Sequence, residues 1–211
     1  MTKKVVILSG GLDSTTVLYK LLSEIDTEVV ALSFNYGQKA SHELDCAKEI
    51  CELNNVEHHI FDISSILDLL KWSSLIDDDK SNVYDPHDTV VPSRNTILLE
   101  LATAFAISND CDAVYYGAIK GDVQDYPDTT PLFVEKINEL NKVNNYKYIP
   151  IYAPLVDMEK YEVVLEAMKL NVPIDMTWSC YVSTEEPCGE CFSCRARIEA
   201  IEQAKKILKE E

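Results

Sequence analysis

The sequence predicts an α/β fold of the doubly wound, Rossmann type, with a mostly parallel sheet of five strands. Short apolar runs alternate with segments of helical periodicity along the 211 residues. The first apolar run ends in a Gly-Gly turn that opens a helical segment. A strand–helix–strand order implies parallel strands joined by right-handed crossovers. Ligands of such sheets bind beyond the carboxyl ends of the strands, so we expect the functional residues there.

Five apolar runs are the expected strands, and seven periodic segments are the expected helices. The strands are predicted at 3–8, 28–33, 56–61, 113–117 and 149–153. The helices are predicted at 14–25, 38–53, 64–70, 96–108, 131–144, 159–170 and 195–210. Two polar stretches, 71–92 and 117–130, are expected to be long loops, which in compact domains are often functional.

Length and composition indicate one folded unit with a small addition. We expect residues 1–170 to form a nucleotide-binding α/β domain and residues 171–211 to form a metal-binding segment packed on it. The formal charge of −17 argues against stable binding of nucleic acid, because such binding depends on basic side chains. A small anionic ligand remains compatible with this charge, because backbone N–H groups can bind phosphate within an acidic protein.

The distribution of apolar residues predicts a soluble, cytoplasmic protein that does not bind membranes. The run Val5–Leu8 is too short for a signal peptide, and no later stretch approaches the roughly 18 apolar residues of a membrane span. In a cytoplasmic protein, the seven cysteines are expected to be thiols or metal ligands.

The segment after the first strand has the composition of a phosphate-binding loop. It reads Leu8-Ser9-Gly10-Gly11-Leu12-Asp13-Ser14. Glycines allow close backbone approach, and the N–H groups at a helix N-terminus attract anions. Neither the Gly-Lys-Ser/Thr of a Walker loop nor Gly-x-Gly-x-x-Gly is present. The alternative is a plain turn in which Asp13 or Ser14 caps the helix.

Four cysteines near the C-terminus have the spacing of a metal site. Cys180, Cys188, Cys191 and Cys194 follow the pattern C-x7-C-x2-C-x2-C. Four thiolates without histidine favour a structural zinc ion, with an iron–sulfur cluster as the second choice. A redox-active pair would leave two of these cysteines unexplained. The other three, Cys46, Cys51 and Cys111, are expected to be core thiols.

The hexapeptide Ser9–Ser14 resembles the Ser-Gly-Gly-x-Asp-Ser signature of the PP-loop ATP pyrophosphatases, whose fold is adenine-nucleotide α-hydrolase-like. We call the segment from Thr177 to Arg195, which carries the four spaced cysteines, the cysteine block. This block and the hexapeptide together make the chain resemble the 7-cyano-7-deazaguanine synthases of queuosine and archaeosine biosynthesis, from Val5 to about Ala200. Further matching stretches are Phe34–Gln38, Val90–Asn95, Tyr126–Asp128, Pro154–Leu155 and Thr177–Tyr181. The chain departs from the family at Ser93, where glycine is usual, at Thr130, and after Gly117.

The resemblance implies an ATP-dependent ligase. The carboxylate of 7-carboxy-7-deazaguanine would attack the α-phosphate of ATP, and ammonia would displace AMP to give an amide. A second ATP would activate the amide oxygen, and loss of AMP would leave the nitrile. The implied cofactors are structural Zn²⁺ and Mg²⁺ with ATP, and the implied assembly is a homodimer.

The resemblance also implies roles for single residues. Leu8 to Ser14 would bind ATP, with Asp13 holding Mg²⁺. The catalytic group would contain Lys160, Arg94 and Asp122, with Lys160 neutralising phosphate charge. Asp122 and Asp128 compete for metal binding and for reading the guanine-like edge. The residues expected to bind the substrate are Tyr36, Gln38, Arg94, Tyr126 and Asp128.

Other functions remain open from the sequence. One is a variant that stops at the amide, 7-amido-7-deazaguanine, after one ATP. A second is a PP-loop enzyme that modifies tRNA, against which the acidic charge counts. A third is an inactive binding module held together by zinc, against which the intact phosphate loop counts. The four histidines (His42, His58, His59 and His87) are expected to be surface or structural residues.

Overall fold

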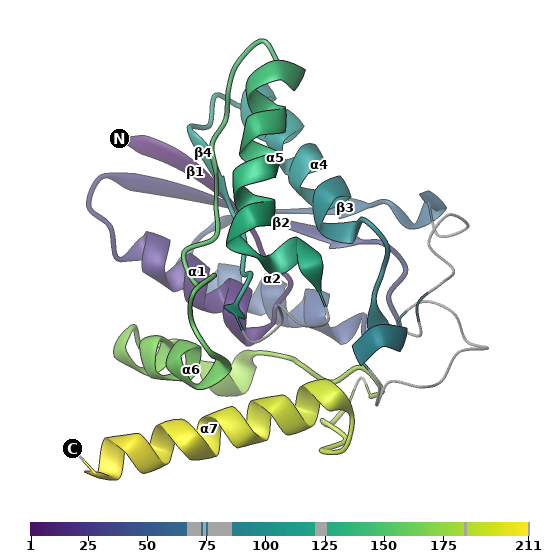
Figure 1. Ribbon diagram of the computed structural model, residues 1–211. Coiled ribbons are helices and arrows are strands. Elements are labelled where there is room, and N and C mark those ends of the chain that lie inside the picture. The colour runs from purple at the N-terminus through teal and green to yellow at the C-terminus, as the bar shows by residue number, and fades with distance from the viewer. Residues whose placement is uncertain (67–72, 74, 76–85, 121–125, 184, 211) are drawn as a thin grey trace.

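Five parallel strands form the centre of the molecule in a computed structural model that describes residues 1–66, 73, 75, 86–120, 126–183 and 185–210. They lie in the order β3-β2-β1-β4-β5 (Figure 1). The strands are β1 (Thr2–Ile7), β2 (Thr27–Asn35), β3 (Glu57–Asp62), β4 (Ala113–Tyr115) and β5 (Ile151–Tyr152). The prediction of a five-stranded, doubly wound sheet is confirmed.

The order of the strands fixes where a ligand would bind. β1 pairs with β2 on one side and with β4 on the other, so the winding direction reverses between β1 and β4. Crossovers that leave neighbouring strands in opposite directions open a crevice at their carboxyl ends. The expected phosphate loop follows β1 and Gly117 follows β4, so both lie at this reversal point.

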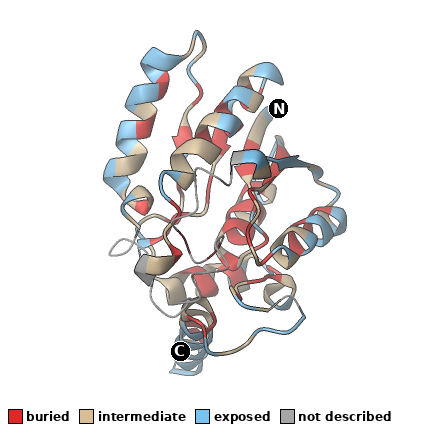
Figure 2. Ribbon diagram, turned by 90° about the vertical axis from the view of Figure 1, so that its right-hand side faces the viewer, coloured by how far each residue is buried: buried red, intermediate tan, exposed pale blue. Residues whose placement is uncertain are grey.

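Helices cover both faces of the sheet (Figures 1 and 2). On one face lie α4 (Arg94–Ser108) and α5 (Pro131–Asn144), and on the other lie α1 (Leu12–Leu22) and α2 (His42–Asn54). Successive residues of a strand point to opposite faces, and both faces here are buried. Val5 therefore packs with Leu99 of α4, while Val6 packs in the same cluster as Val17 of α1.

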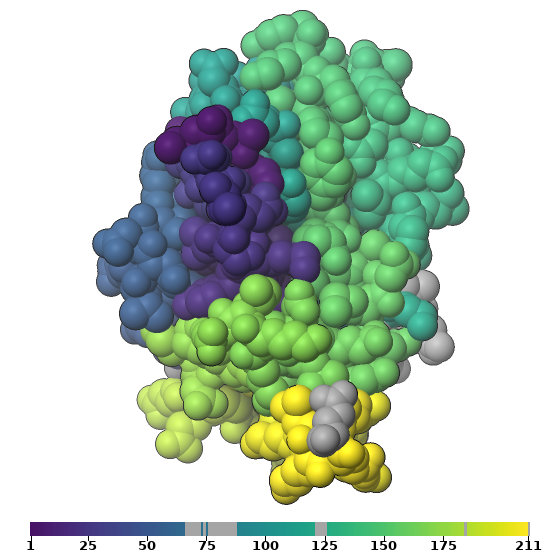
Figure 3. Space-filling model, turned by 90° about the vertical axis from the view of Figure 1, so that its left-hand side faces the viewer, coloured from purple at the N-terminus to yellow at the C-terminus, as the bar shows by residue number. Residues whose placement is uncertain are grey.

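A third layer lies beneath α1. The helix α6 (Lys160–Lys169) packs against the long C-terminal helix α7 (Phe192–Glu210). Figure 1 shows α7 along the lower edge of the molecule, and Figure 3 shows it end-on, in yellow, below the green surface that includes α6. Leu12 of α1 joins Val164 of α6 and Ala200 of α7 in one buried cluster. The C-terminal helix is therefore anchored beside the start of α1.

Helix starts differ most from the sequence prediction. The helix expected at 38–53 begins at His42, because the side chain of Gln38 hydrogen-bonds to neighbouring backbone in the preceding loop. The helix expected at 96–108 begins at Arg94, after Ser93 in a left-handed conformation with φ of 57°. The helix expected at 195–210 begins at Phe192. Of the helix expected at 64–70, Ser64–Ile66 is a 3-10 turn and the rest lies outside the described residues.

Among the described residues, no helix combines the length and the apolar composition that a membrane crossing requires.

Candidate functional site

The loop after β1 is held between α2 and the end of β4. Gly10 has a φ of 81°, and a Cβ there would lie 2.0 Å from the backbone oxygen of Glu43. A Cβ on Gly117 would lie 2.7 Å from the backbone nitrogen of Ser14. Real Cβ atoms do not approach so closely, so both positions require glycine.

The N-terminus of α1 faces the pocket without a capping side chain. Gly11 is the residue that caps the helix, so the alternative interpretation in which Asp13 or Ser14 is the cap is wrong. The Ser14 hydroxyl accepts from the Ser9 nitrogen at 3.1 Å and donates to the Gly11 oxygen at 3.2 Å. The first N–H groups of a helix have no partner within the helix, and here they border a cavity, which suits an anion.

An ion pair closes the phosphate side of the pocket. Lys160 is the first residue of α6, and its Nζ donates to both carboxylate oxygens of Asp13, at 2.8 and 2.6 Å. Both side chains are largely shielded from solvent and line the same pocket as Ser9 and Ser14. A cation and a carboxylate thus lie together beside the uncapped start of α1.

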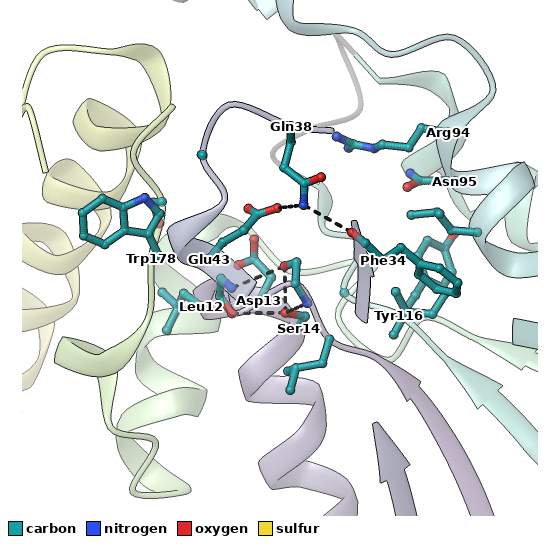
Figure 4. Close-up of a pocket in the computed structure, with 18 of the residues that line it drawn as sticks. Leu12, Asp13, Ser14, Phe34, Gln38, Glu43, Arg94, Asn95, Tyr116 and Trp178 are labelled. Atoms are coloured by element: carbon teal, nitrogen blue, oxygen red, sulfur yellow. Dashed lines mark hydrogen bonds between the residues drawn. The ribbon is translucent and has the colours of Figure 1, made fainter. Parts of the chain in front are cut away.

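Gln38 and Arg94 line the opposite side of this pocket (Figure 4), and Tyr36 lines the pocket beside Arg94. The Gln38 amide accepts from the Tyr36 nitrogen at 3.0 Å and donates to the Phe34 oxygen at 3.2 Å. Arg94 Nη1 donates to the Tyr36 hydroxyl at 3.3 Å. Burial lowers the pKa of Arg94, but the nearby hydroxyls of Tyr36 and Tyr181 outweigh it, so the pKa is raised and Arg94 stays charged.

Glu43, on the first turn of α2, is a pocket residue that the sequence analysis did not identify. Its Oε1 accepts from Gln38 Nε2 at 2.9 Å. The side chain is open to the pocket, but protein atoms surround it on the other sides. Burial therefore raises the pKa of the carboxyl from 4.5 to about 7, against the smaller opposing effects of Gln38 and Arg94. It lies five residues beyond Gln38, within the helix expected at 38–53, and no motif in the sequence distinguishes it.

The remaining predicted substrate residues flank the pocket. Tyr126 shares a hydrogen bond between its hydroxyl and that of Thr89. Asp128 lies in the 3-10 turn Pro127–Thr129, and its backbone oxygen accepts from the Tyr116 hydroxyl at 3.5 Å. In this turn, Thr129 lines the pocket. Asp122 lies outside the described residues, so the roles predicted for Asp122 and Asp128 stay predictions.

Several other lining residues come from segments that are distant in sequence, and the sequence analysis assigned them no role in binding. The additional lining residues include Phe34, Asn95, Tyr116, Ser179, Tyr181 and Ser193. Ser179 and Ser193 belong to the cysteine block, whose spacing directs attention to its sulfurs and not to its hydroxyls. The cysteine block therefore forms part of the pocket wall.

The four C-terminal cysteines converge on one point. The Sγ atoms of Cys180, Cys188, Cys191 and Cys194 all lie within 4.8 Å of one another. Tetrahedral zinc bonded to sulfur at about 2.3 Å places its ligands about 3.8 Å apart. The donor set therefore fits a single metal ion, whereas the sulfurs around a four-iron cluster must stand further apart. Cys46, Cys51 and Cys111 are free and buried, as predicted.

The cysteine block is joined to the phosphate loop through Trp178. The Trp178 backbone nitrogen donates to the Gly10 oxygen at 2.9 Å, and its indole Nε1 donates to the Cys180 oxygen at 2.9 Å. The ring also contacts the edge of His42, at 4.5 Å between ring centroids. Arg197 of α7 donates to the Ser179 hydroxyl at 3.3 Å from the other side. The metal site and the phosphate loop are thus parts of one packed structure.

Comparisons with known proteins agree with this arrangement. The family described as "Queuosine biosynthesis protein QueC" matches residues 3–205. A 7-cyano-7-deazaguanine synthase of Hahella chejuensis is 45% identical over 206 residues, which are 95% of this chain and 89% of that protein. The "7-cyano-7-deazaguanine synthase 1" of Colwellia psychrerythraea is 44% identical, over 95% of this chain and 94% of its own length.

Solved structures support the fold alone. The U34-tRNA thiolase NcsA of Methanococcus maripaludis, with its [4Fe-4S] cluster, has a TM-score of 0.57 at 20% identity. The match covers all of this chain and 66% of that one. The NH3-dependent NAD synthetase of Campylobacter jejuni has a TM-score of 0.51 at 18% identity, covering 99% and 77% of the two chains.

Proposed function

The chain belongs to the QueC family of queuosine biosynthesis proteins, and we propose that it is an ATP-dependent ligase that makes 7-cyano-7-deazaguanine from 7-carboxy-7-deazaguanine and ammonia. The observation that carries this proposal is the 44% identity to a 7-cyano-7-deazaguanine synthase over almost the whole chain. The pocket supports it, because a phosphate loop and a set of polar side chains face one another across a single cavity.

The phosphate side is suited to activating an oxygen with ATP. In our proposal the N–H groups of Gly11 to Ser14 and the Ser9 and Ser14 hydroxyls bind the leaving pyrophosphate. Lys160 leaves Asp13 and pairs with the phosphates, while Asp13 holds the accompanying Mg²⁺. The ion pair at 2.6 Å keeps both groups in place before the nucleotide arrives. Hydroxide is a poor leaving group and AMP is a good one, so adenylation makes both the acid and the amide reactive.

The opposite side is suited to a polar heterocycle that carries a carboxylate. The planar guanidinium of Arg94 can pair with the substrate carboxylate or with the α-phosphate. Tyr36 and Gln38 present a ring and an amide to the same space, and we assign them to binding the deazaguanine together with Tyr126 and Asp128. Asp122 completes the proposed catalytic group with Lys160 and Arg94.

We assign the four-cysteine site to structural zinc. Four cysteines leave no open coordination position, so the metal would stabilise the segment that carries Trp178 and Ser179. We also propose that the protein is a cytoplasmic homodimer that binds neither nucleic acid nor membranes stably.

A product assay tests the ligase. Incubation with 7-carboxy-7-deazaguanine, ammonium and ATP should convert the heterocycle to the nitrile, which mass spectrometry detects. Two AMP and two pyrophosphate should be released for each nitrile formed. Amide as the final product, with one AMP, would identify the variant that stops early. If AMP release does not depend on 7-carboxy-7-deazaguanine, both ligase functions are refuted. The tRNA-modifying enzyme and the inactive binding module would then remain.

Cysteine substitution tests the metal site. Cys188→Ser should reduce the zinc content from about one ion per chain and lower the melting temperature, because metal binding stabilises the fold of such a segment. Cys51→Ser is the matched control, because Cys51 is a buried thiol of α2 outside the cluster, so metal content should not change. Unchanged metal content and melting in Cys188→Ser would contradict the assignment.

A further inference from the structure

The carboxyl group of Glu43 lies in the pocket, and the proposed function gives it no role. Its backbone oxygen touches the Gly10 position of the phosphate loop, and its side chain points into the cavity beside Gln38 (Figure 4). Gln38 Nε2 donates a hydrogen bond to Glu43 Oε1 at 2.9 Å, and this bond fixes the orientation of the carboxyl. The carboxyl therefore lies between the phosphate loop and Gln38, where the phosphate side and the opposite side of the pocket meet.

Burial, and not the surrounding charges, raises the pKa of the Glu43 carboxyl. Arg94 of α4 favours its ionised form, and Tyr36 is near enough that Glu43 raises the pKa of the tyrosine hydroxyl. Cys46, one turn along α2, is affected by Glu43 in the same direction. The other charged groups of the pocket, Asp13 and Lys160, are paired with each other. A carboxyl with a pKa of about 7 is suited to accepting and releasing a proton near pH 7.

The proposed reaction requires such a group at the nitrogen. After the amide oxygen has bonded to the α-phosphorus and pyrophosphate has left, the adenylated amide is a cation with two N–H bonds. Both protons must leave the nitrogen for the neutral nitrile to form. The Arg94 guanidinium is a cation without a free electron pair to accept them, and the Lys160 ammonium is paired with Asp13.

We propose that Glu43 is the base that takes the first of these protons during conversion of the adenylated amide to the nitrile, an inference that rests on the proposed function. The first N–H proton passes to the Glu43 carboxylate and leaves a neutral adenylated imidate. The electron pair of the second N–H bond then forms the third carbon–nitrogen bond as the carbon–oxygen bond breaks. The second proton departs with AMP, and Glu43 returns its own proton to water.

The test separates the two halves of the reaction. Glu43→Gln retains an oxygen that can accept from Gln38, so the loop should keep its shape. With 7-amido-7-deazaguanine and ATP as substrates, nitrile formation should slow by about 10² to 10⁴-fold. With 7-carboxy-7-deazaguanine and ammonium, the variant should accumulate amide where the unmodified protein makes nitrile. Glu49→Gln, at an exposed position of the same helix, is the matched control and should behave like the unmodified protein.

The pH profile is the second measurement. The kcat for nitrile formation should fall on the acidic side of about pH 7 in the unmodified protein, and this limb should disappear in Glu43→Gln. Glu43→Asp should retain the limb at a lower rate. Nitrile formation by Glu43→Gln at the rate of the unmodified protein would overturn the proposal. So would a raised KM for the amide with unchanged kcat, or recovery of the rate at higher Mg²⁺.

The failure of this inference differs from the failure of the proposed function. An unmodified protein that makes nitrile, together with a Glu43→Gln variant that makes it equally fast, removes only the role of Glu43. An unmodified protein that makes no nitrile from either substrate removes the proposed function and the role of Glu43 with it.

Discussion

The two sides of the pocket are built from different materials. The phosphate side consists of one continuous segment, Ser9–Ser14, whose backbone does most of the contacting, with Gly117 and Lys160 brought against it. The opposite side consists of side chains such as Gln38, Glu43 and Arg94 that hold one another in place. Where backbone packs against backbone, as at Gly10, an added side-chain atom cannot be accommodated. On the opposite side, a side chain can be replaced by a shorter or uncharged one while the backbone stays in place. Substitutions on the two sides should therefore fail in different ways.

Gly10→Ala should have the largest effect. The added Cβ would lie 2.0 Å from the Glu43 oxygen, and the φ of 81° disfavours alanine in addition. Overpacking costs about 1–3 kcal/mol and a left-handed residue about 1–2 kcal/mol, so the unfolding free energy should fall by roughly 2–5 kcal/mol. Urea denaturation measures this loss, and AMP release should be undetectable.

Gly189→Ala is the control that isolates the contact. Gly189 has a similar φ of 74°, but a Cβ there meets nothing within 4 Å. It should lose only the conformational cost of about 1–2 kcal/mol. Equal losses in the two variants would mean that the close approach of Gly10 to Glu43 does not constrain the loop.

Lys160→Ala should follow in size. Loss of a cation beside developing phosphate charge typically costs about 10²–10³-fold in kcat, with the fold intact. Steady-state AMP release measures the effect. Lys120→Ala removes the neighbouring exposed pair with Glu159 at 2.9 Å, and it should change the rate less than twofold. If Lys160→Ala also loses less than twofold, Lys160 does not act on the phosphates.

Glu43→Gln should change stability in a manner that depends on pH. The folded-state pKa of about 7 lies above the ordinary 4.5, so ionisation disfavours the folded state. This destabilisation is absent below pH 4.5, grows as the pH rises to about 7 and is constant above. The variant should therefore be more stable than the unmodified protein at pH 8 by about 1–3 kcal/mol, and by much less at pH 5. Denaturation at the two pH values measures this difference, and a difference that does not vary with pH would contradict the raised pKa.

Arg94→Lys should give the smallest of these changes. Lysine keeps the charge but cannot keep a hydrogen bond to Tyr36 and a planar pairing with a substrate anion at once. We expect the KM for 7-carboxy-7-deazaguanine to rise about tenfold while the KM for ATP stays within twofold. A larger effect on ATP than on the heterocycle would move Arg94 to the phosphate side of the pocket.

The difference between the two sides also explains what the sequence could reveal. Ser9–Ser14 is contiguous and its glycines are required by backbone geometry, so the loop was recognisable without any structure. The alternation of apolar runs likewise predicted five strands that run parallel, but not their order in the sheet. Helix starts were less predictable, because they depend on tertiary contacts such as the turn of Gln38 onto the Phe34 and Tyr36 backbone.

The side-chain half of the pocket was only partly accessible from the sequence. Arg94, Tyr36 and Gln38 were found through family resemblance and do line the pocket. Glu43 was missed because the periodicity of 38–53 predicted a position inside a helix. In the structure α2 begins at His42, so Glu43 lies in its first turn and faces the loop. Ser93 illustrates the opposite case. A serine stands there where the family usually has glycine, and its φ of 57° gives the physical reason for that usage.

The hydrogen bond from Trp178 to Gly10 has a consequence for how the protein is made. The phosphate loop is among the first segments to leave the ribosome, but one of its carbonyl groups is satisfied by a backbone donor 168 positions later. Val5 and Val6 are likewise buried only by strands and helices that are synthesised later. A growing chain therefore holds an incomplete loop until the cysteine block has been synthesised and folded against it. ATP turnover should be a property of the finished polypeptide alone.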